Sequence, residues 1–214
     1  MTSVRFGLTA LSALLVSAAS AQSPAPVAFR VISPIYDQLV TFAMPANFTV
    51  VAENNNGTNY IREAVLKGET GKSWTQMITV TGAKGLASNP NANPKLTPET
   101  FAGSIANGFK SACPDSFAAK GFGTARFSDQ DAYVAVASCG SVGDDRHGET
   151  ALIVAVKGRS DYYTLQWAER DQGGGKPVID EARWLDRLRQ LQPIRFCPRV
   201  PGESAPYPSC IGKS

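Results

Sequence analysis

The sequence predicts an α+β fold, in which a mainly antiparallel sheet of about six or seven strands is covered by two helices. Short apolar runs alternate with turn signals along the chain, and two other segments have the spacing of amphipathic helices. Two strand candidates, residues 132–137 and 151–156, are apolar on both faces. Because a sheet with one face in water alternates apolar and polar residues, both faces of these strands must be covered.

The composition is typical of one globular domain. The chain has 214 residues, of which 43% are hydrophobic, 18% charged and 9% aromatic. This is enough apolar sequence for a core and excludes disorder. The formal net charge is only +3, and there is no basic stripe with interleaved aromatic residues of the kind that binds nucleic acid. We therefore expect no nucleic-acid partner.

The amino terminus has the three parts of a secretory signal in the right order. Arg5 is followed by an uncharged stretch, residues 6–16, and then by Ala19-Ser20-Ala21 before Gln22. We expect residues 1–21 to be a signal peptide that is cleaved after Ala21, which places the mature protein in the periplasm or outside the cell. The apolar stretch is shorter than the roughly 20 residues that a membrane-spanning helix needs, so we expect no membrane span after cleavage.

Proline positions divide the rest of the chain. Residues 22–34 contain Pro24, Pro26 and Pro34 and are predicted to be an extended leader outside the core. Residues 35–195 are predicted to form a single α+β domain, and residues 196–214 a proline-rich tail closed by a disulfide.

The predicted strands are bounded by turn residues. Residues 47–53 and 58–66 flank Asn54-Asn55-Asn56-Gly57, whose residues tolerate positive φ, so this pair is predicted to be a hairpin. The other candidate strands are residues 74–81, 123–127, 132–139, 150–157 and 162–168. Consecutive strands joined by short polar turns indicate antiparallel pairing.

The two helices are predicted from caps and periodicity. Thr97 is a good N-cap, Pro98 suits the first helical position, and the apolar residues Phe101, Ile105, Phe109 and Ala112 share one side. In the second helix, Trp184, Leu185, Leu188 and Leu191 form an apolar stripe that ends before Pro193. These two helices and the loop of residues 82–96 are the expected cover of the sheet.

All four cysteines, Cys113, Cys139, Cys197 and Cys210, follow the signal. An even number of cysteines in an exported chain indicates two disulfides, for which three pairings exist. We favour Cys113 with Cys139 and Cys197 with Cys210, because these pairs join a helix end to a strand end and close the tail. The spacing differs from that of a zinc knuckle, and the single histidine is distant in sequence. We expect no metal.

The order of these elements resembles that of the PsbP-like group of small exported proteins. The resemblance covers a strand hairpin, the segment Trp74-Thr75-Gln76-Met77-Ile78-Thr79-Val80, a capped helix, a three-strand meander and a closing amphipathic helix. The chain also resembles uncharacterised secreted bacterial proteins with segments like Cys113-Pro114-Asp115, Ser138-Cys139-Gly140 and Tyr163-Thr164-Leu165-Gln166-Trp167-Ala168-Glu169-Arg170. The resemblance implies a non-enzymatic accessory or binding module without shared catalytic residues. The tail, residues 196–214, departs from the PsbP-like pattern.

Two segments contain residue types of phosphate-binding or catalytic motifs. Gly68-Glu69-Thr70-Gly71-Lys72-Ser73 imitates the end of a phosphate-binding loop, but Leu66 stands at the required first glycine and a strand follows. The only histidine, His147, lies in a polar loop with Asp144, Asp145 and Glu149. This loop has the residue types of a general base and its orienting carboxylate, yet a nucleophile elbow is absent from the sequence.

The leading hypothesis is an exported soluble binding or accessory module. Its candidate binding residues are Trp74, Tyr163, Asp144, Asp145 and His147, its partner is an envelope or extracellular protein or a small ligand, and we expect neither a catalytic residue nor a cofactor. The alternatives are a small secreted hydrolase that uses His147, and a secreted effector or inhibitor that docks on a partner protein.

Overall fold

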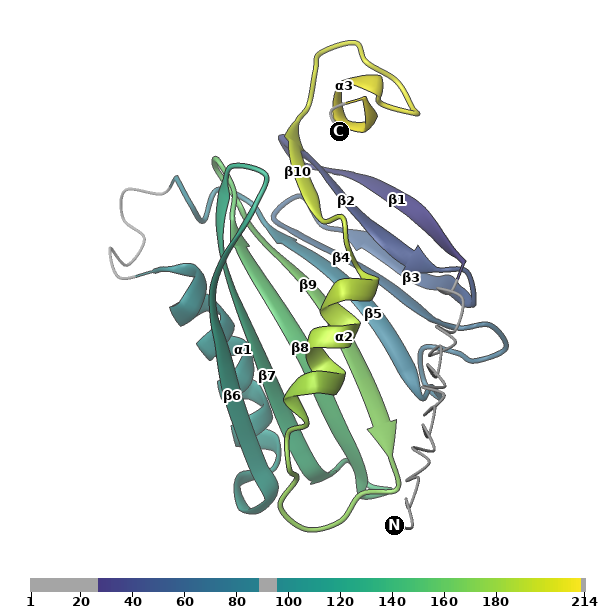
Figure 1. Cartoon of the computed structure of the whole chain (residues 1–214), viewed down its shortest axis with the longest axis vertical. Coiled ribbons are helices and arrows are strands. Elements are labelled where there is room, and N and C mark those ends of the chain that lie inside the picture. Colours follow the sequence, from purple (N-terminus) through teal and green to yellow (C-terminus); the bar gives the residue numbers. More distant parts are fainter. Residues whose placement is uncertain (1–26, 89–95, 213–214) are drawn as a thin grey trace, which may run out of the picture.

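The computed structural model describes residues 27–88 and 96–212 (Figure 1). The predicted signal peptide, residues 1–21, lies outside the described residues. So does the part of the predicted leader before residue 27, together with residues 89–95 of the loop that was expected to cover the sheet.

A seven-stranded antiparallel sheet forms the centre of the fold, in the order β3-β4-β5-β9-β8-β7-β6. Its strands are β3 (Phe48–Asn55), β4 (Asn59–Leu66), β5 (Gln76–Ala83), β6 (Phe117–Phe127), β7 (Gln130–Val142), β8 (His147–Lys157) and β9 (Tyr162–Asp171). The sequence predicted all seven, including the hairpin between β3 and β4. The structure extends β6 toward its amino terminus, because residues 117–121 pair with β7 although they are largely small and partly exposed.

A second, three-stranded sheet was not predicted. It contains β1 (Ala28–Ile35), β2 (Gln38–Pro45) and β10 (Arg195–Pro198), with β2 in the middle. The prediction of an extended leader over residues 22–34 is therefore wrong for residues 28–34, which pair with β2 and bury Ser33. Pro34 suggested a leader, but proline is tolerated on an edge strand such as β1 because one of its edges has no ladder partner. The predicted tail likewise begins inside this sheet, since β10 pairs with β2.

Helix α1 (Pro98–Ala112) covers one face of the main sheet. The Thr97 side chain accepts a hydrogen bond from the Thr100 backbone N–H at 3.2 Å, and Pro98 occupies the first turn, as predicted. The helix packs on β7 and β8, against Ala135, Ala137, Ile153 and Ala155. Only Ala102 of the helix is fully buried, while Phe101, Ile105 and Phe109 are partly buried at its margins. A short 3₁₀ turn (Pro114–Ser116) follows.

Helix α2 (Glu181–Gln190) and the small sheet cover the opposite face (Figure 1). Asp180 caps the helix through the Arg183 N–H, and Trp184 enters the core. Arg183 and Arg187 both form ion pairs with Glu169 of β9, whose side chain is only 7% exposed. Strands β2 and β10 thus provide a cover of this face that the sequence did not predict.

Two disulfides brace these layers. Cys113 at the end of α1 pairs with Cys139 of β7, with Cα atoms 5.7 Å apart. Cys197 of β10 pairs with Cys210 of the short helix α3 (Pro208–Ile211), with Cα atoms 5.6 Å apart. The favoured pairing is therefore confirmed. No helix among the described residues is both long and apolar enough to cross a bilayer.

Removing the disulfides one at a time should destabilise the protein unequally. The bonds close loops with sequence separations of 26 and 13 residues, and closing the longer loop restricts the unfolded chain more. We expect serine replacements of Cys113 and Cys139 to lower the free energy of unfolding by roughly 3.5 kcal/mol, and those of Cys197 and Cys210 by roughly 3 kcal/mol. Urea unfolding without reductant measures both losses, and stability unchanged by either pair of replacements would contradict the prediction.

Candidate functional site

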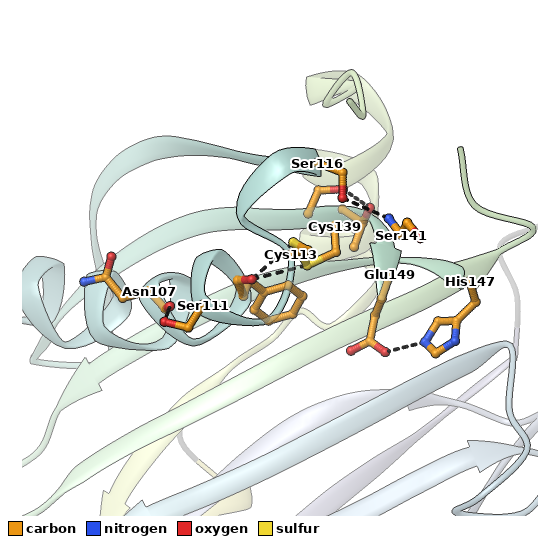
Figure 2. Close-up of a disulfide and its surroundings, with 11 residues drawn as sticks. Asn107, Ser111, Cys113, Ser116, Cys139, Ser141, His147 and Glu149 are labelled. Atoms are coloured by element: carbon orange, nitrogen blue, oxygen red, sulfur yellow. Dashed lines mark hydrogen bonds and ion pairs between the residues drawn. A yellow bond between two sulfur atoms is a disulfide. The ribbon is translucent and has the colours of Figure 1, made fainter. Parts of the chain in front are cut away.

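The candidate site lies at the end of the main sheet where α1 finishes and β8 begins. The turn between β7 and β8, residues 143–146, and the loop after β9, residues 172–176, meet there beside the Cys113–Cys139 disulfide. Figure 2 shows this disulfide close to Ser116 and Ser141, with His147 and Glu149 on the neighbouring strand. The Ser141 N–H donates to Ser116 Oγ at 3.1 Å, which ties the end of β7 to the turn that follows α1.

His147 is held between two carboxylates. Its Nδ1 lies 2.5 Å from Asp145 Oδ1, and its Nε2 lies 3.3 Å from Glu149 Oε2. The His147 side chain is 16% exposed. The hydrogen bond from His147 lowers the pKa of Asp145 below its ordinary value. Both ring nitrogens of His147 therefore face carboxylate oxygens. The polar loop around His147, which was predicted to contain binding residues, is a charged turn held by these two contacts.

Arg170 connects this cluster to Trp74. The Arg170 Nε donates to Glu149 Oε2 at 2.9 Å, and its guanidinium lies 3.7 Å from the centre of the Trp74 ring. The Trp74 side chain is 8% exposed and packs with Val65 and Met77. A guanidinium on an indole face is a favourable cation–π contact. Arg170 thus covers one face of the Trp74 ring. In an exposed tryptophan this face would be free to contact a ligand.

Glycines allow the loop of residues 172–176 to lie on the strand ends. The Gly174 N–H donates to the Gly140 carbonyl at 2.7 Å. A Cβ atom on Gly140 would come within 1.8 Å of the Gly175 carbonyl oxygen, so no larger residue fits there. Gly173 has a φ of +73°, in the left-handed region that favours glycine. The close approach of the two backbones requires glycine on both sides.

Three open cavities converge on this loop. The largest, of about 700 Å³, lies between the turn after α1, the residue 143–146 turn and the loop. The others, of about 450 and 350 Å³, lie on the strand ends and beside Trp74 and His147. Gln172 lines all three cavities, and Asp145 lines two of them. Their linings include Ser116, Ser141, Arg146 and Lys176, so this end of the sheet offers many hydrogen-bonding groups within a small region.

The structure brings together some of the predicted binding residues and separates another. Asp145 and His147 are in contact, and the exposed Asp144 is adjacent to them in the same turn. Trp74 reaches the same cavity as His147. Tyr163 is fully buried near the opposite end of β9, where its hydroxyl donates to Asp161 Oδ2 at 3.0 Å.

Sequence reasoning missed Arg170 and the loop of residues 172–176 as parts of the site. The run Gly173-Gly174-Gly175 was the available signal for the loop, because three successive glycines indicate a close backbone approach or a turn. Within residues 27–88 and 96–212, no three His, Cys, Asp or Glu side chains are grouped to hold a metal ion.

Solved structures with low sequence identity are similar to this chain. No known protein family and no curated protein matches the sequence. Similar solved structures include the cyanobacterial PsbP, CyanoP, from Synechocystis sp. PCC 6803, with a TM-score of 0.46 and 12% identity over 86% of this chain and 99% of that chain.

Two other similar structures come from other bacteria. LpqN of Mycobacterium tuberculosis, described as involved in cell envelope biogenesis, has a TM-score of 0.39 and 8% identity over 80% of this chain and 91% of that chain. A Bacteroides thetaiotaomicron VPI-5482 protein has a TM-score of 0.39 and 10% identity over 79% of this chain. This chain spans about half the length of the Bacteroides protein, 51%. The similarities concern the fold alone.

The Asp145–His147 contact makes stability depend on pH in a definite direction. Because the pKa of Asp145 is lowered in the folded protein, its stabilising effect is present above the ordinary pKa of an aspartate and is lost as the pH falls through the lowered value. We expect Asp145→Asn to be less stable than the native protein near neutral pH, and this difference to shrink in acid. Chemical unfolding over a pH series, with Asp144→Asn as the matched control, measures this. A difference that grows in acid would contradict the prediction.

Proposed function

We propose that the protein is an exported binding or accessory module whose ligand or partner contacts the end of the main sheet around Gln172. The convergence of three open cavities on one glycine-rich loop carries this proposal. A concave region where several polar groups converge can orient a ligand through hydrogen bonds. The Cys113–Cys139 disulfide lies in the wall of this region, so the site is braced without a ligand.

Export is part of the same proposal. It is supported by the signal-like amino terminus and by two disulfides that pair all four cysteines. Disulfides persist in oxidising compartments and are rare in the cytosol. A periplasmic or secreted location is therefore the proposed one.

The geometry favours binding over the hydrolase alternative. A histidine that activates a serine needs one ring nitrogen directed at the hydroxyl and the other held by a carboxylate. In this structure both His147 nitrogens face carboxylates, those of Asp145 and Glu149. Neither nitrogen is directed at a serine hydroxyl of the described residues. The effector or inhibitor alternative uses the same surface, with a protein as the partner.

The amino terminus of the mature protein tests export directly. If residues 1–21 are a signal peptide, the protein recovered from its native host begins at Gln22 and lacks thiols that alkylate without reduction. Intact-mass measurement of the protein from envelope and culture fractions checks both points. Recovery of the reduced, full-length chain from the cytosol would contradict export.

Site-specific crosslinking tests the position of the binding surface. We expect a photoreactive amino acid at position 172, in the exported protein, to crosslink a discrete partner or ligand. The same group at position 129 is the control, because Asp129 is exposed at the opposite end of β7 and lines none of these three cavities. Charge reversal at Arg146 and Lys176 should reduce the crosslink at position 172. A crosslink at position 129 alone, or one that is equal at both positions, would contradict the proposed surface.

A further inference from the structure

The dipeptide Asn-Gly occurs twice in the described residues, in two different backbone settings. Asn56-Gly57 lies in the turn between β3 and β4, whereas Asn107-Gly108 lies inside α1. The amide of an asparagine that precedes glycine is open to attack by the next backbone nitrogen, because glycine has no side chain to obstruct the approach. The fold therefore decides which of the two pairs can react.

Asn56 is presented at the surface with its side-chain carbonyl polarised. Its Oδ1 accepts hydrogen bonds from the Asn59 N–H at 2.7 Å, the Thr58 N–H at 3.1 Å and the Thr58 hydroxyl at 3.1 Å. Gly57 has a φ of +90°, and no atom lies within 4 Å of the position that its Cβ would take. The turn thus draws electron density from the Asn56 amide and leaves Gly57 unobstructed.

We propose that Asn56 is a site of spontaneous deamidation in the folded protein. The Gly57 nitrogen, after losing its proton to solvent base, forms a bond to Asn56 Cγ. Ammonia then leaves with a proton from solvent, and a five-membered succinimide remains. Water opens this ring at either carbonyl, which gives aspartate or isoaspartate at position 56 and changes no oxidation state.

The three donors on Asn56 Oδ1 assist the slow part of this reaction. Attack on Cγ moves negative charge onto Oδ1, and the donors that lie 2.7–3.1 Å from this oxygen stabilise that charge. One contact opposes the reaction, because the Gly57 N–H donates to Asn55 Oδ1 at 2.9 Å and must leave it before attack. The hydrogen bonds to Asn56 Oδ1 therefore raise the rate of deamidation, whereas the bond from the Gly57 N–H to Asn55 Oδ1 lowers it. Separate variants can measure these two effects.

The fold protects the second pair. Asn107 and Gly108 lie in the middle of α1, where the helical hydrogen-bond ladder holds the backbone. Attack would require the Gly108 nitrogen to turn toward the Asn107 side chain, and this breaks the helix locally. The disulfide at Cys113 anchors the end of the same helix to β7 and so restrains such an opening.

The change would alter a sheet edge. β3 is the edge strand of the main sheet, and Asn55 pairs with Tyr60 beside the turn. Aspartate at position 56 adds a negative charge there, and isoaspartate inserts an extra backbone carbon into the turn. We expect the mixture of asparagine, aspartate and isoaspartate to be found in the β3–β4 hairpin and not in the site around Gln172.

Peptide mapping of the aged protein tests the proposal. The folded, disulfide-intact protein is incubated at mildly alkaline pH, and conversion at Asn54, Asn55, Asn56 and Asn107 is followed by mass spectrometry. We expect Asn56 to convert first and Asn107 at least about tenfold more slowly, because helix opening is required there. In denaturant with the disulfides reduced, the two Asn-Gly sites should convert at similar rates.

Two variants test the part played by the turn. Thr58→Val removes one donor to Asn56 Oδ1 and should slow conversion severalfold, whereas Asn55→Ala frees the Gly57 N–H and should speed it. Equal conversion of Asn56 and Asn107 in the folded protein would overturn the proposal, as would an Asn56 that reacts only after unfolding. Unchanged rates in both variants would overturn the role assigned to the hydrogen bonds.

Discussion

The whole architecture depends on the need to bury both faces of the two central strands, β7 and β8. Residues 151–156 of β8 are at most 1% exposed, whichever face they point to. On one face most of the buried side chains are small, with alanine at positions 135, 137 and 155 beside Ile153, and this lets α1 approach the sheet closely. On the other face Leu152 and Val154 project further and meet larger apolar groups. The two faces are therefore covered differently. Helix α1 packs on the face with small side chains, and α2 together with the three-stranded sheet packs on the other.

One buried carboxylate determines where the second cover lies. Glu169 points from β9 into the interface with α2, and a nearly buried carboxylate is costly unless it is paired. Arg183 and Arg187 both reach it from successive turns of α2, and the Arg187 guanidinium also lies 4.8 Å from the Trp167 ring centre. Helix α2 is thereby fixed along the sheet. The chain between β9 and α2 must then cross the sheet end, which is where the candidate site forms.

Local signals in the sequence were enough to predict the hairpin at Asn56 and the start of α1 at Thr97, because their stabilising contacts are within a few residues. The second sheet was not predictable in the same way. Strand β2 lies between β1 and β10, whose residues come from opposite ends of the chain, and no local pattern records such a pairing. The candidate site likewise combines residues that a local pattern can predict with one that it cannot. Asp145 and His147 are neighbours in sequence, whereas Arg170 joins them only because the β8–β9 register places it opposite Glu149.

The shape of the candidate site comes mainly from the absence of side chains. A Cβ on Gly148 would lie 2.0 Å from Asp171 Oδ1, and one on Gly140 would strike the backbone of the loop above it. These close approaches bring the loop of residues 172–176 onto the strand ends, beside the side chains of Arg146, Gln172 and Lys176 that line the largest cavity. Since the Asp145–His147–Glu149 cluster and the Cys113–Cys139 disulfide also fix the surrounding turns, little ordering remains to be done on binding. A preorganised surface of this kind suits recognition, because the entropic cost of association is reduced.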